Sequence, residues 1–145
     1  MGTIKLENIL ITPLKRIDVL GGDVLHAMKA TDPGFCGYGE AYFSIVTQGA
    51  IKAWKMHQKM TLNLLVPYGE VRFVFNLPDS KYYRTETIGI TNYVRLTVPP
   101  GIWFGFQGIA SPYSLILNIA DIAHDPNEVS RRALEEINFN WNFNV

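Results

Sequence analysis

The stretch Gly49-Ala50-Ile51-Lys52-Ala53-Trp54-Lys55-Met56-His57 is typical of a short strand that follows a turn-forming glycine. Similar segments make up most of the chain, separated by Gly and Pro turns such as Pro99-Pro100-Gly101. Several are rich in β-branched and aromatic residues, as in Val71-Arg72-Phe73-Val74-Phe75. The pattern predicts an all-β sandwich or barrel built from the strands Ile9–Ile11, Gly22–Lys29, Tyr42–Thr47, Ala50–His57, Thr61–Val66, Glu70–Leu77, Thr85–Ile90, Tyr93–Val98, Ile102–Gln107 and Ser114–Ala120.

The C-terminal region predicts a helix and a tail. Asp125 is a good N-cap, Pro126 suits the first helical position, and Glu128 is placed to close a capping box, so a short helix is expected over Asn127–Ile137. The tail Asn138–Val145 alternates aromatic residues with Asn, which predicts a final strand or an extended arm that packs three aromatic rings. Residues 1–145 are therefore expected to form a single jelly-roll-like β-barrel with a short C-terminal helix.

Composition excludes several classes of protein. The 145 residues are 48% hydrophobic, and 13 basic residues balance 13 acidic ones, so a nucleic-acid wrapper or a polybasic membrane binder is not expected. The single cysteine, Cys36, rules out an internal disulfide framework and a thiolate metal cluster. No apolar stretch is long enough to span a membrane, and the N-terminus lacks the pattern of a secretory signal. These features predict a cytoplasmic protein.

Two short motifs and their flanking segments resemble a known family. Gly49–His57 is similar to the first cupin motif, which is Gly, five residues, His, any residue and His, and Pro99–Phe106 is similar to the second, Pro-x-Gly-x-x-His. Together with Gly39–Ser44 and Asn118–Pro126, their order and spacing resemble the dTDP-4-dehydrorhamnose 3,5-epimerase family of sugar-nucleotide cupins. The resemblance implies a cupin-like jelly roll, a homodimer, and an NDP-4-keto-6-deoxyhexose substrate in surface polysaccharide (O-antigen-type) biosynthesis.

The chain departs from metal-binding cupins at the ligand positions. Lys55 replaces the first histidine, Phe104 replaces the last one, and only His57 remains. A protonated lysine and a phenylalanine cannot bind a divalent ion, so no metal is expected. The resemblance also implies a reaction without metal, and no cofactor is expected.

The family's chemistry is proton transfer next to a ketone, which needs a base, an acid and a group that stabilises the oxyanion. The family's Arg-Gly-x-His sequence corresponds here to Lys52-Ala53-Trp54-Lys55, and His124 stands in the place of the family's Tyr acid. The resemblance therefore implies His57 or Lys55 as the base and His124 as the acid. Lys52, with Arg72 or Arg95, would hold the diphosphate. Epimerisation and keto-isomerisation both fit these requirements.

Strand geometry constrains the two lysines. Lys55 and His57 lie two residues apart and share one strand face, so both enter the barrel if that face points inward. A lysine in an apolar cavity has a lowered pKa and can act as a base or form a Schiff base with a ketone, whereas a lysine at the barrel mouth would simply be solvated. Lys52 has the opposite parity and reaches the same cavity only if the strand contains a bulge.

The remaining candidates each have a structural alternative. Asp121 could orient a histidine or end a strand. His26 lies on an early strand where the family contacts its nucleotide sugar, and Trp103 could stack on a base or a sugar, although aromatic residues in a small barrel often belong to the core. The same holds for Trp54, Tyr42, Phe104 and Phe106.

Two other functions remain open at this point. The changed base and acid positions favour a non-catalytic nucleotide-sugar or carbohydrate-binding cupin as the alternative to an isomerase. A further possibility is a subunit of a polysaccharide pathway that uses its aromatic tail as a contact.

Overall fold

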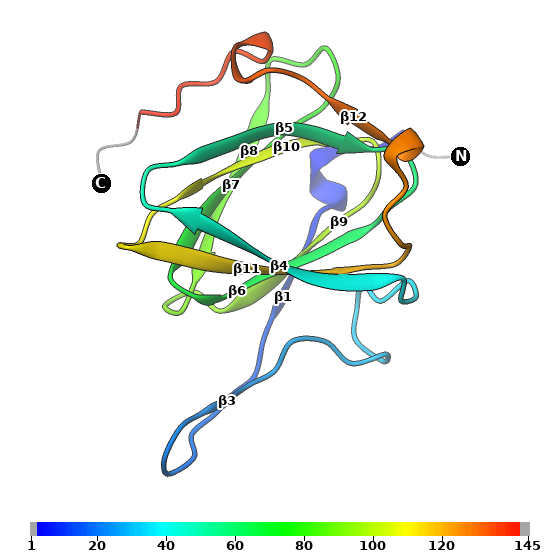
Figure 1. The fold of residues 1–145 in the computed structure, drawn as a ribbon. Helices are drawn as coiled ribbons and strands as arrows, with labels where there is room; N and C mark the ends of the chain where they lie inside the picture. Colours follow the sequence, from blue (N-terminus) through cyan, green and yellow to red (C-terminus); the bar gives the residue numbers. More distant parts are fainter. Residues whose placement is uncertain (1–2, 143–145) are drawn as a thin grey trace.

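Two five-stranded antiparallel sheets face each other and form the barrel (Figure 1). The computed structural model describes residues 3–142. The first sheet has the order β1 (Leu10–Pro13), β9 (Val94–Val98), β6 (Leu62–Tyr68), β11 (Tyr113–Ala120) and β4 (Glu40–Thr47). The second has the order β12 (Val129–Arg131), β5 (Ile51–His57), β10 (Trp103–Gly108), β7 (Glu70–Asn76) and β8 (Tyr83–Gly89). This architecture confirms the predicted all-β jelly roll.

One predicted strand is largely absent. Of Gly22–Lys29, only Val24–Leu25 forms a strand, β3, and it pairs with β2 (Arg16–Ile17). This small hairpin projects away from the barrel, as Figure 1 shows. Its strands contact no large sheet, so its apolar side chains have no core to join and regular pairing stays short.

The inner faces of the two sheets form the main core. Val71, Phe73 and Phe75 alternate along β7 and point into it, where they are fully buried. Val74 points to the opposite face and belongs to a second buried cluster. Strand β7 is therefore covered on both faces, which explains the apolar run Phe73-Val74-Phe75.

The second cluster lies on the outer face of the second sheet, under the C-terminal arm. Trp54 of β5 packs against Trp141 with ring centroids 5.3 Å apart, and Phe139 contacts Trp141 and Tyr83 at 5.0 and 5.1 Å. Residues 138–142 form no strand, so the tail is the extended arm, the second of the two predicted alternatives. Two of its three aromatic residues, Phe139 and Trp141, pack as expected. The third, Phe143, lies outside the described residues.

The predicted C-terminal α-helix is wrong. Asp125 does accept a hydrogen bond from the Asn127 N–H at 3.0 Å, but the helical turn η2 ends after Pro126–Glu128. Val129–Arg131 then forms β12 and pairs with β5, which would otherwise be a sheet edge. Glu128 is buried under this strand instead of closing a capping box. Tertiary pairing therefore overrides local helix preference.

Two further 3-10 turns complete the chain, η1 (Leu6–Asn8) near the N-terminus and η3 (Leu134–Glu136) in the C-terminal arm. Among the described residues, no helix is long and apolar enough to cross a membrane.

Candidate active site

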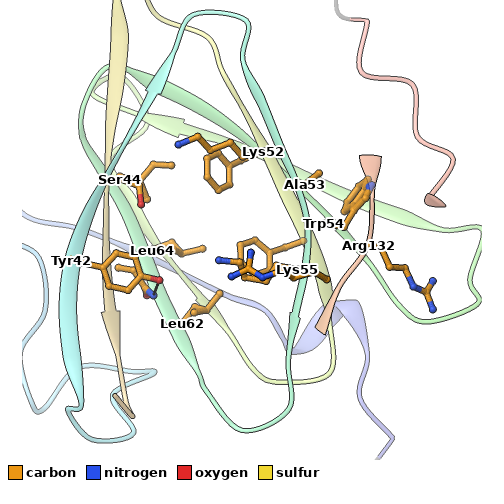
Figure 2. Close-up of a pocket in the computed structure, with 14 residues that line it drawn as sticks. Tyr42, Ser44, Lys52, Ala53, Trp54, Lys55, Leu62, Leu64 and Arg132 are labelled. Atoms are coloured by element: carbon orange, nitrogen blue, oxygen red, sulfur yellow. Dashed lines mark hydrogen bonds between the residues drawn. The ribbon is translucent and has the colours of Figure 1, made fainter. Parts of the chain in front are cut away.

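A cavity of about 410 Å³ opens between the two sheets (Figure 2). One wall comes from β4 and β11, and the opposite wall comes from β5 and β12. Apolar side chains of β6 and β10 line much of the remainder. The lining residues are Tyr42, Ser44, Lys52, Ala53, Trp54, Lys55, Leu62, Leu64, Phe104, Phe106, Ile116, Asn118, Arg131 and Arg132.

A bulge in β5 brings Lys52 and Lys55 to the same cavity. The register places Lys55 opposite Phe104 but Ala53 opposite Gly105, so Trp54 is an extra residue between the two pairs. Close approach of the strands at this point requires glycine, because a Cβ on Gly105 would lie 2.4 Å from the Ala53 Cβ. The sequence predicted that both lysines reach one cavity only if the strand contains a bulge, and the structure contains this bulge.

The cavity wall is strongly cationic although the chain has no net charge. Lys52, Lys55 and Arg131 line it with cationic side chains, whereas the Arg132 guanidinium points away toward Trp103 (Figure 2), and no carboxylate lines the cavity among the described residues. Burial lowers the pKa of Lys55, and the nearby charges of Arg131 and Lys52 lower it further. The site therefore suits an anionic ligand. The two arginines were not singled out from the sequence, because they fall in the segment predicted to be a helix.

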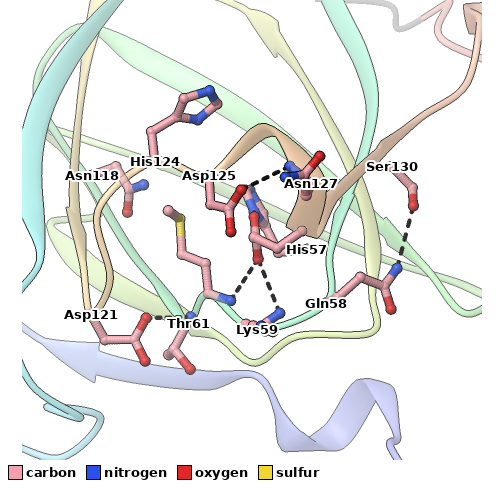
Figure 3. A network of polar contacts seen from close by, with 12 residues as sticks. His57, Gln58, Lys59, Thr61, Asn118, Asp121, His124, Asp125, Asn127 and Ser130 are labelled. Carbon is pink, nitrogen blue, oxygen red and sulfur yellow. Dashed lines mark hydrogen bonds and ion pairs between the residues drawn. The ribbon is translucent and has the colours of Figure 1, made fainter.

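A buried hydrogen bond between His57 and Glu128 lies beside the cavity (Figure 3). The His57 ring stacks on Phe104, which lines the cavity, with centroids 6.1 Å apart, and its Nδ1 lies 2.5 Å from Glu128 Oε2. The other carboxylate oxygen, Oε1, accepts the N–H groups of Lys59 and Met60 at 3.0 and 2.8 Å. These three contacts fix the carboxylate, which in turn fixes the ring orientation.

The electrostatics of this pair favour a neutral imidazole. Burial, together with the charges of Lys55 and Arg131, lowers the pKa of His57 more than the Glu128 carboxylate raises it. Burial would raise the pKa of Glu128, but the hydrogen bonds from His57, Met60 and Lys59 bring it below its ordinary value. A charged Glu128 assigns the proton to Nδ1, so Nε2 carries the basic lone pair. His57 is therefore a suitable proton acceptor.

Tyr42 and Asn118 form a polar pair on the wall opposite Lys55. The Asn118 Nδ2 group donates to the Tyr42 hydroxyl at 3.1 Å, while Asn118 Oδ1 accepts the Asn63 N–H at 3.2 Å. Because the hydroxyl oxygen already accepts a bond, its own proton is available for an oxygen in the cavity. Sequence reasoning considered Tyr42 only for stacking and missed Asn118. Tyr42 and Asn118 lie in the segments 39–44 and 118–126, which flank the two motifs, and this position could have identified them as candidate site residues.

The structure does not bring His124 or Asp121 to the cavity. His124 is exposed, and its backbone N–H donates to the Glu40 carboxylate. Asp121 accepts the Thr61 N–H at 2.8 Å, which corresponds to the strand-ending alternative rather than to a His–Asp pair. Neither residue therefore has the geometry expected of the acid or of a group that orients the base.

Arg95 is fully buried and is occupied by internal partners. Its guanidinium donates to the carbonyl oxygens of Ala27 and Pro33 at 2.8 Å each and to Asn63 Oδ1 at 3.2 Å. An Asp32 oxygen lies 3.5 Å away. These contacts tie the loop after β3 to the first sheet, so Arg95 is placed for a structural role and not for phosphate binding.

Three other predicted contacts also lie off the cavity. The Arg72 guanidinium lies 5.9 Å from the Phe139 ring centroid, under the C-terminal arm. Trp103 is buried in the second cluster, with the Arg132 guanidinium 4.6 Å from its ring centroid. His26 lies beside the projecting hairpin, and its backbone carbonyl accepts the Tyr93 hydroxyl at 2.8 Å. Of the predicted site residues, the structure brings together Lys52, Lys55 and, next to them, His57.

No group of three or more His, Cys, Asp or Glu side chains is arranged to hold a metal ion within residues 3–142. Cys36 is a free, exposed cysteine.

Comparison with known proteins identifies the family. A dTDP-sugar isomerase from Desulfovibrio desulfuricans G20 is 34% identical, with a TM-score of 0.84 over 89% of this chain and 86% of that one. This chain belongs to the dTDP-sugar isomerase and epimerase family. The resemblance inferred from the two motifs is thereby confirmed, although no family model matches the sequence.

Two solved structures of lower sequence identity share the fold, and one curated protein is similar in sequence. The sugar 3,4-ketoisomerase QdtA from Thermoanaerobacterium thermosaccharolyticum is 18% identical, with a TM-score of 0.75 over 88% of this chain and 90% of that one. The epimerase RmlC from Legionella pneumophila is 15% identical, with a TM-score of 0.74 over 91% and 76% of the two chains. The spore coat polysaccharide biosynthesis protein SpsL of Bacillus subtilis (strain 168) is 25% identical over 114 residues, which are 72% of this chain and 76% of SpsL.

Proposed function

We propose that the protein is an isomerase that moves protons next to the ketone of a nucleotide-linked 4-keto-6-deoxyhexose, in surface polysaccharide biosynthesis. The observation that carries this proposal is the cavity between the sheets, which has the cationic side chains of Lys52, Lys55 and Arg131 and no carboxylate on its described walls. Neighbours of this fold include enzymes described as bound to TDP and to dTDP-4-keto-L-rhamnose. A diphosphate between the cations would leave the sugar over the apolar floor.

Tyr42 on the cavity wall and His57 beside the cavity suit the two proton transfers. His57, held neutral beside Glu128, would remove the proton from the carbon next to the ketone. Tyr42 lies on the opposite sheet and would supply a proton on the other face or to the ketone oxygen. Lys52 and Arg131 would hold the diphosphate. We assign the role of acid to Tyr42 instead of His124, because Tyr42 lines the cavity and His124 does not.

Solvent deuterium incorporation tests this activity. dTDP-4-keto-6-deoxyglucose is incubated with the enzyme in D₂O, and exchange at C3 and C5 is followed by NMR against a heat-killed control. Exchange above the control supports an isomerase, and analysis of the products then separates epimerisation from movement of the ketone between C4 and C3. No exchange with several nucleotide sugars would overturn the proposal.

A non-catalytic nucleotide-sugar-binding cupin is the second candidate, favoured by the replacement of the two motif histidines by Lys55 and Phe104. Such a protein would be thermally stabilised by dTDP without any deuterium exchange. Alanine at both Lys55 and His57 would then cost it little affinity, whereas an isomerase would lose turnover.

We also propose a homodimer. Along the edge strand β4, Tyr42 and Ser44 face the cavity, while Phe43 and Ile45 face outward and are 62% and 56% exposed. Large apolar side chains on an outer sheet face favour a protein contact. Light scattering of wild type and of Phe43→Asp/Ile45→Asp tests this, and an unchanged mass would contradict it. The aromatic tail is a poorer contact, because Phe139 and Trp141 pack within their own chain.

A cytoplasmic location completes the proposal. The free, exposed thiol of Cys36 is compatible with a reducing compartment. Cell fractionation with a tagged full-length chain would test this location, and recovery in an extracytoplasmic fraction would contradict it.

A further inference from the structure

Lys55 occupies an unusual position for a lysine. Along β5 its neighbours are Phe104 of β10 on one side and Arg131 of β12 on the other. It is half-buried and lines the cavity together with Leu62 and Lys52. Within residues 3–142 no hydrogen bond or ion pair holds its amine, whereas Arg16 and Arg84 are each paired with a carboxylate at 2.9 Å.

This environment favours the neutral form of the amine. Burial lowers the pKa of Lys55, and the charges of Arg131 and Lys52 act in the same direction. Desolvation and a neighbouring cation are the two means by which proteins turn lysine into a nucleophile for carbonyl groups. The bulge at Trp54 places the second lysine close enough to contribute.

We propose that Lys55 is a covalent catalyst that forms an imine with the ketone of the nucleotide sugar. For its substrate, this inference rests on the proposed function. The Nζ lone pair attacks the C4 carbonyl carbon, and the oxygen takes up a proton while nitrogen loses one. A proton from solvent on the carbinolamine hydroxyl then lets it leave as water, which gives a protonated imine. No oxidant or reductant is needed.

The imine would replace the oxyanion as the electron sink. A protonated imine acidifies the neighbouring C–H bond, so removal of that proton by His57 gives a neutral enamine. Protonation of the enamine carbon on the other face, by Tyr42, changes the configuration. Addition of one water molecule then restores the ketone and the free amine and releases one proton to solvent, which balances the water lost and the proton taken up earlier. Lysine at the position of a family histidine would thus change how the ketone is activated.

Reductive trapping tests the covalent step. Full-length protein is incubated with dTDP-4-keto-6-deoxyglucose and sodium cyanoborohydride, and the adduct is located by peptide mass spectrometry. We expect one adduct, on Lys55, that is suppressed by excess dTDP. Lys55→Arg should abolish it, while Lys29→Arg, a change at an exposed lysine outside the cavity, should leave it intact. Stabilisation of Lys55→Arg by dTDP shows that this variant is folded.

A second measurement needs no variant. Each imine cycle replaces the C4 ketone oxygen with solvent oxygen, so turnover in H₂¹⁸O should label C4 once per cycle. Labelling at the enzyme-free rate during turnover would overturn the imine. Adducts spread over exposed lysines and insensitive to dTDP would also overturn it.

Four combinations of the trapping and exchange results separate the imine from the proposed function. A Lys55 adduct with deuterium exchange supports both. Exchange without an adduct overturns the imine and leaves the isomerase. An adduct without exchange supports the imine and overturns the isomerase. Neither result, with binding of dTDP intact, overturns both.

Discussion

The backbones of Trp54 and Arg132 exchange two hydrogen bonds, from the Trp54 N–H to the Arg132 carbonyl at 3.0 Å and from the Arg132 N–H to the Trp54 carbonyl at 3.1 Å. The Trp54 indole N–H adds a third, to the Leu134 carbonyl at 3.1 Å. Trp54 is the extra residue of the β5 bulge, so residues 132–134, at the start of the C-terminal arm, hold the bulge in place. The positions of both cavity lysines therefore depend on the arm.

Removing the Trp141 ring should weaken both the fold and the site. Trp141 is 8% exposed and packs on Trp54, so Trp141→Ala is expected to lower the free energy of unfolding by about 3 kcal/mol, measured in urea. The affinity of the folded variant for dTDP should fall as well. Asn142→Ala, at an exposed position of the same arm, should stay within about 0.5 kcal/mol of wild type. Equal effects of the two variants would refute the packing role.

A paired substitution tests the bulge itself. Gly105→Ala should destabilise the protein and weaken dTDP binding, because the new Cβ would lie 2.4 Å from the Ala53 Cβ. Ala53→Gly removes that Cβ, so the double variant should recover part of the loss. Thermal unfolding and dTDP titration of all four proteins give the coupling between the two sites. Simple additivity would show that the two positions do not compete for this space.

Lys52 and Arg95 should give opposite results. Lys52→Met removes a cation at the cavity, so the dissociation constant of dTDP should rise roughly 10-fold to 100-fold, with little change in stability. Arg95→Lys leaves buried carbonyl oxygens without their donors and should cost about 3 kcal/mol, with unchanged affinity of the folded fraction. Loss of dTDP affinity in the folded Arg95→Lys variant would contradict the structural role and would indicate that Arg95 binds the phosphate.

Two variants distinguish the candidate acids. Tyr42→Phe removes only the hydroxyl and should slow turnover by about 10²–10⁴-fold. His124→Asn should change turnover less than about twofold, as expected of an exposed residue outside the cavity. Steady-state kinetics with the same keto sugar, with dTDP affinity measured separately, compares them. A large loss in His124→Asn with an active Tyr42→Phe would reverse the assignment.

Stability should fall on the acid side because of His57 and Glu128. The folded pKa of His57 lies below its ordinary 6.5, so below that pH the unfolded chain takes up a proton that the folded chain does not, and stability decreases. The folded pKa of Glu128 lies below 4.5, so its stabilisation is present above that pH and is lost as the pH falls through the folded value. Both effects have the same sign.

Urea unfolding from about pH 8 down to pH 4 measures this dependence. His57→Asn should lose most of the slope between pH 6.5 and 5, although its stability at pH 8 will also be lower because Glu128 loses its partner. His124→Asn, which alters an exposed histidine, is the matched control and should retain the wild-type slope. A slope that is the same in His57→Asn and in wild type would contradict the neutral, buried imidazole.

Local sequence was a good guide to the strands. Strands β4 to β11 lie close to their expected ranges, because short segments bounded by Gly and Pro turns depend mostly on local composition. The predicted helix over Asn127–Ile137 was wrong for a tertiary reason. The Asp125 N-cap forms, but pairing with the edge of β5 and the buried hydrogen bonds of Glu128 stabilise a strand more than local preference stabilises a helix.

The sequence by itself determined the barrel, the family and the identity of the lysines at the motif positions, since these follow from residue types and spacing along one strand. Only the tertiary structure decided which charges meet. A one-residue bulge puts Lys52 beside Lys55, and β12 adds Arg131 to them. Arg95 and His124 are equally polar in sequence, but one is buried among carbonyl groups and the other is exposed. Convergence on a cavity depends on contacts between distant strands, which local spacing does not specify.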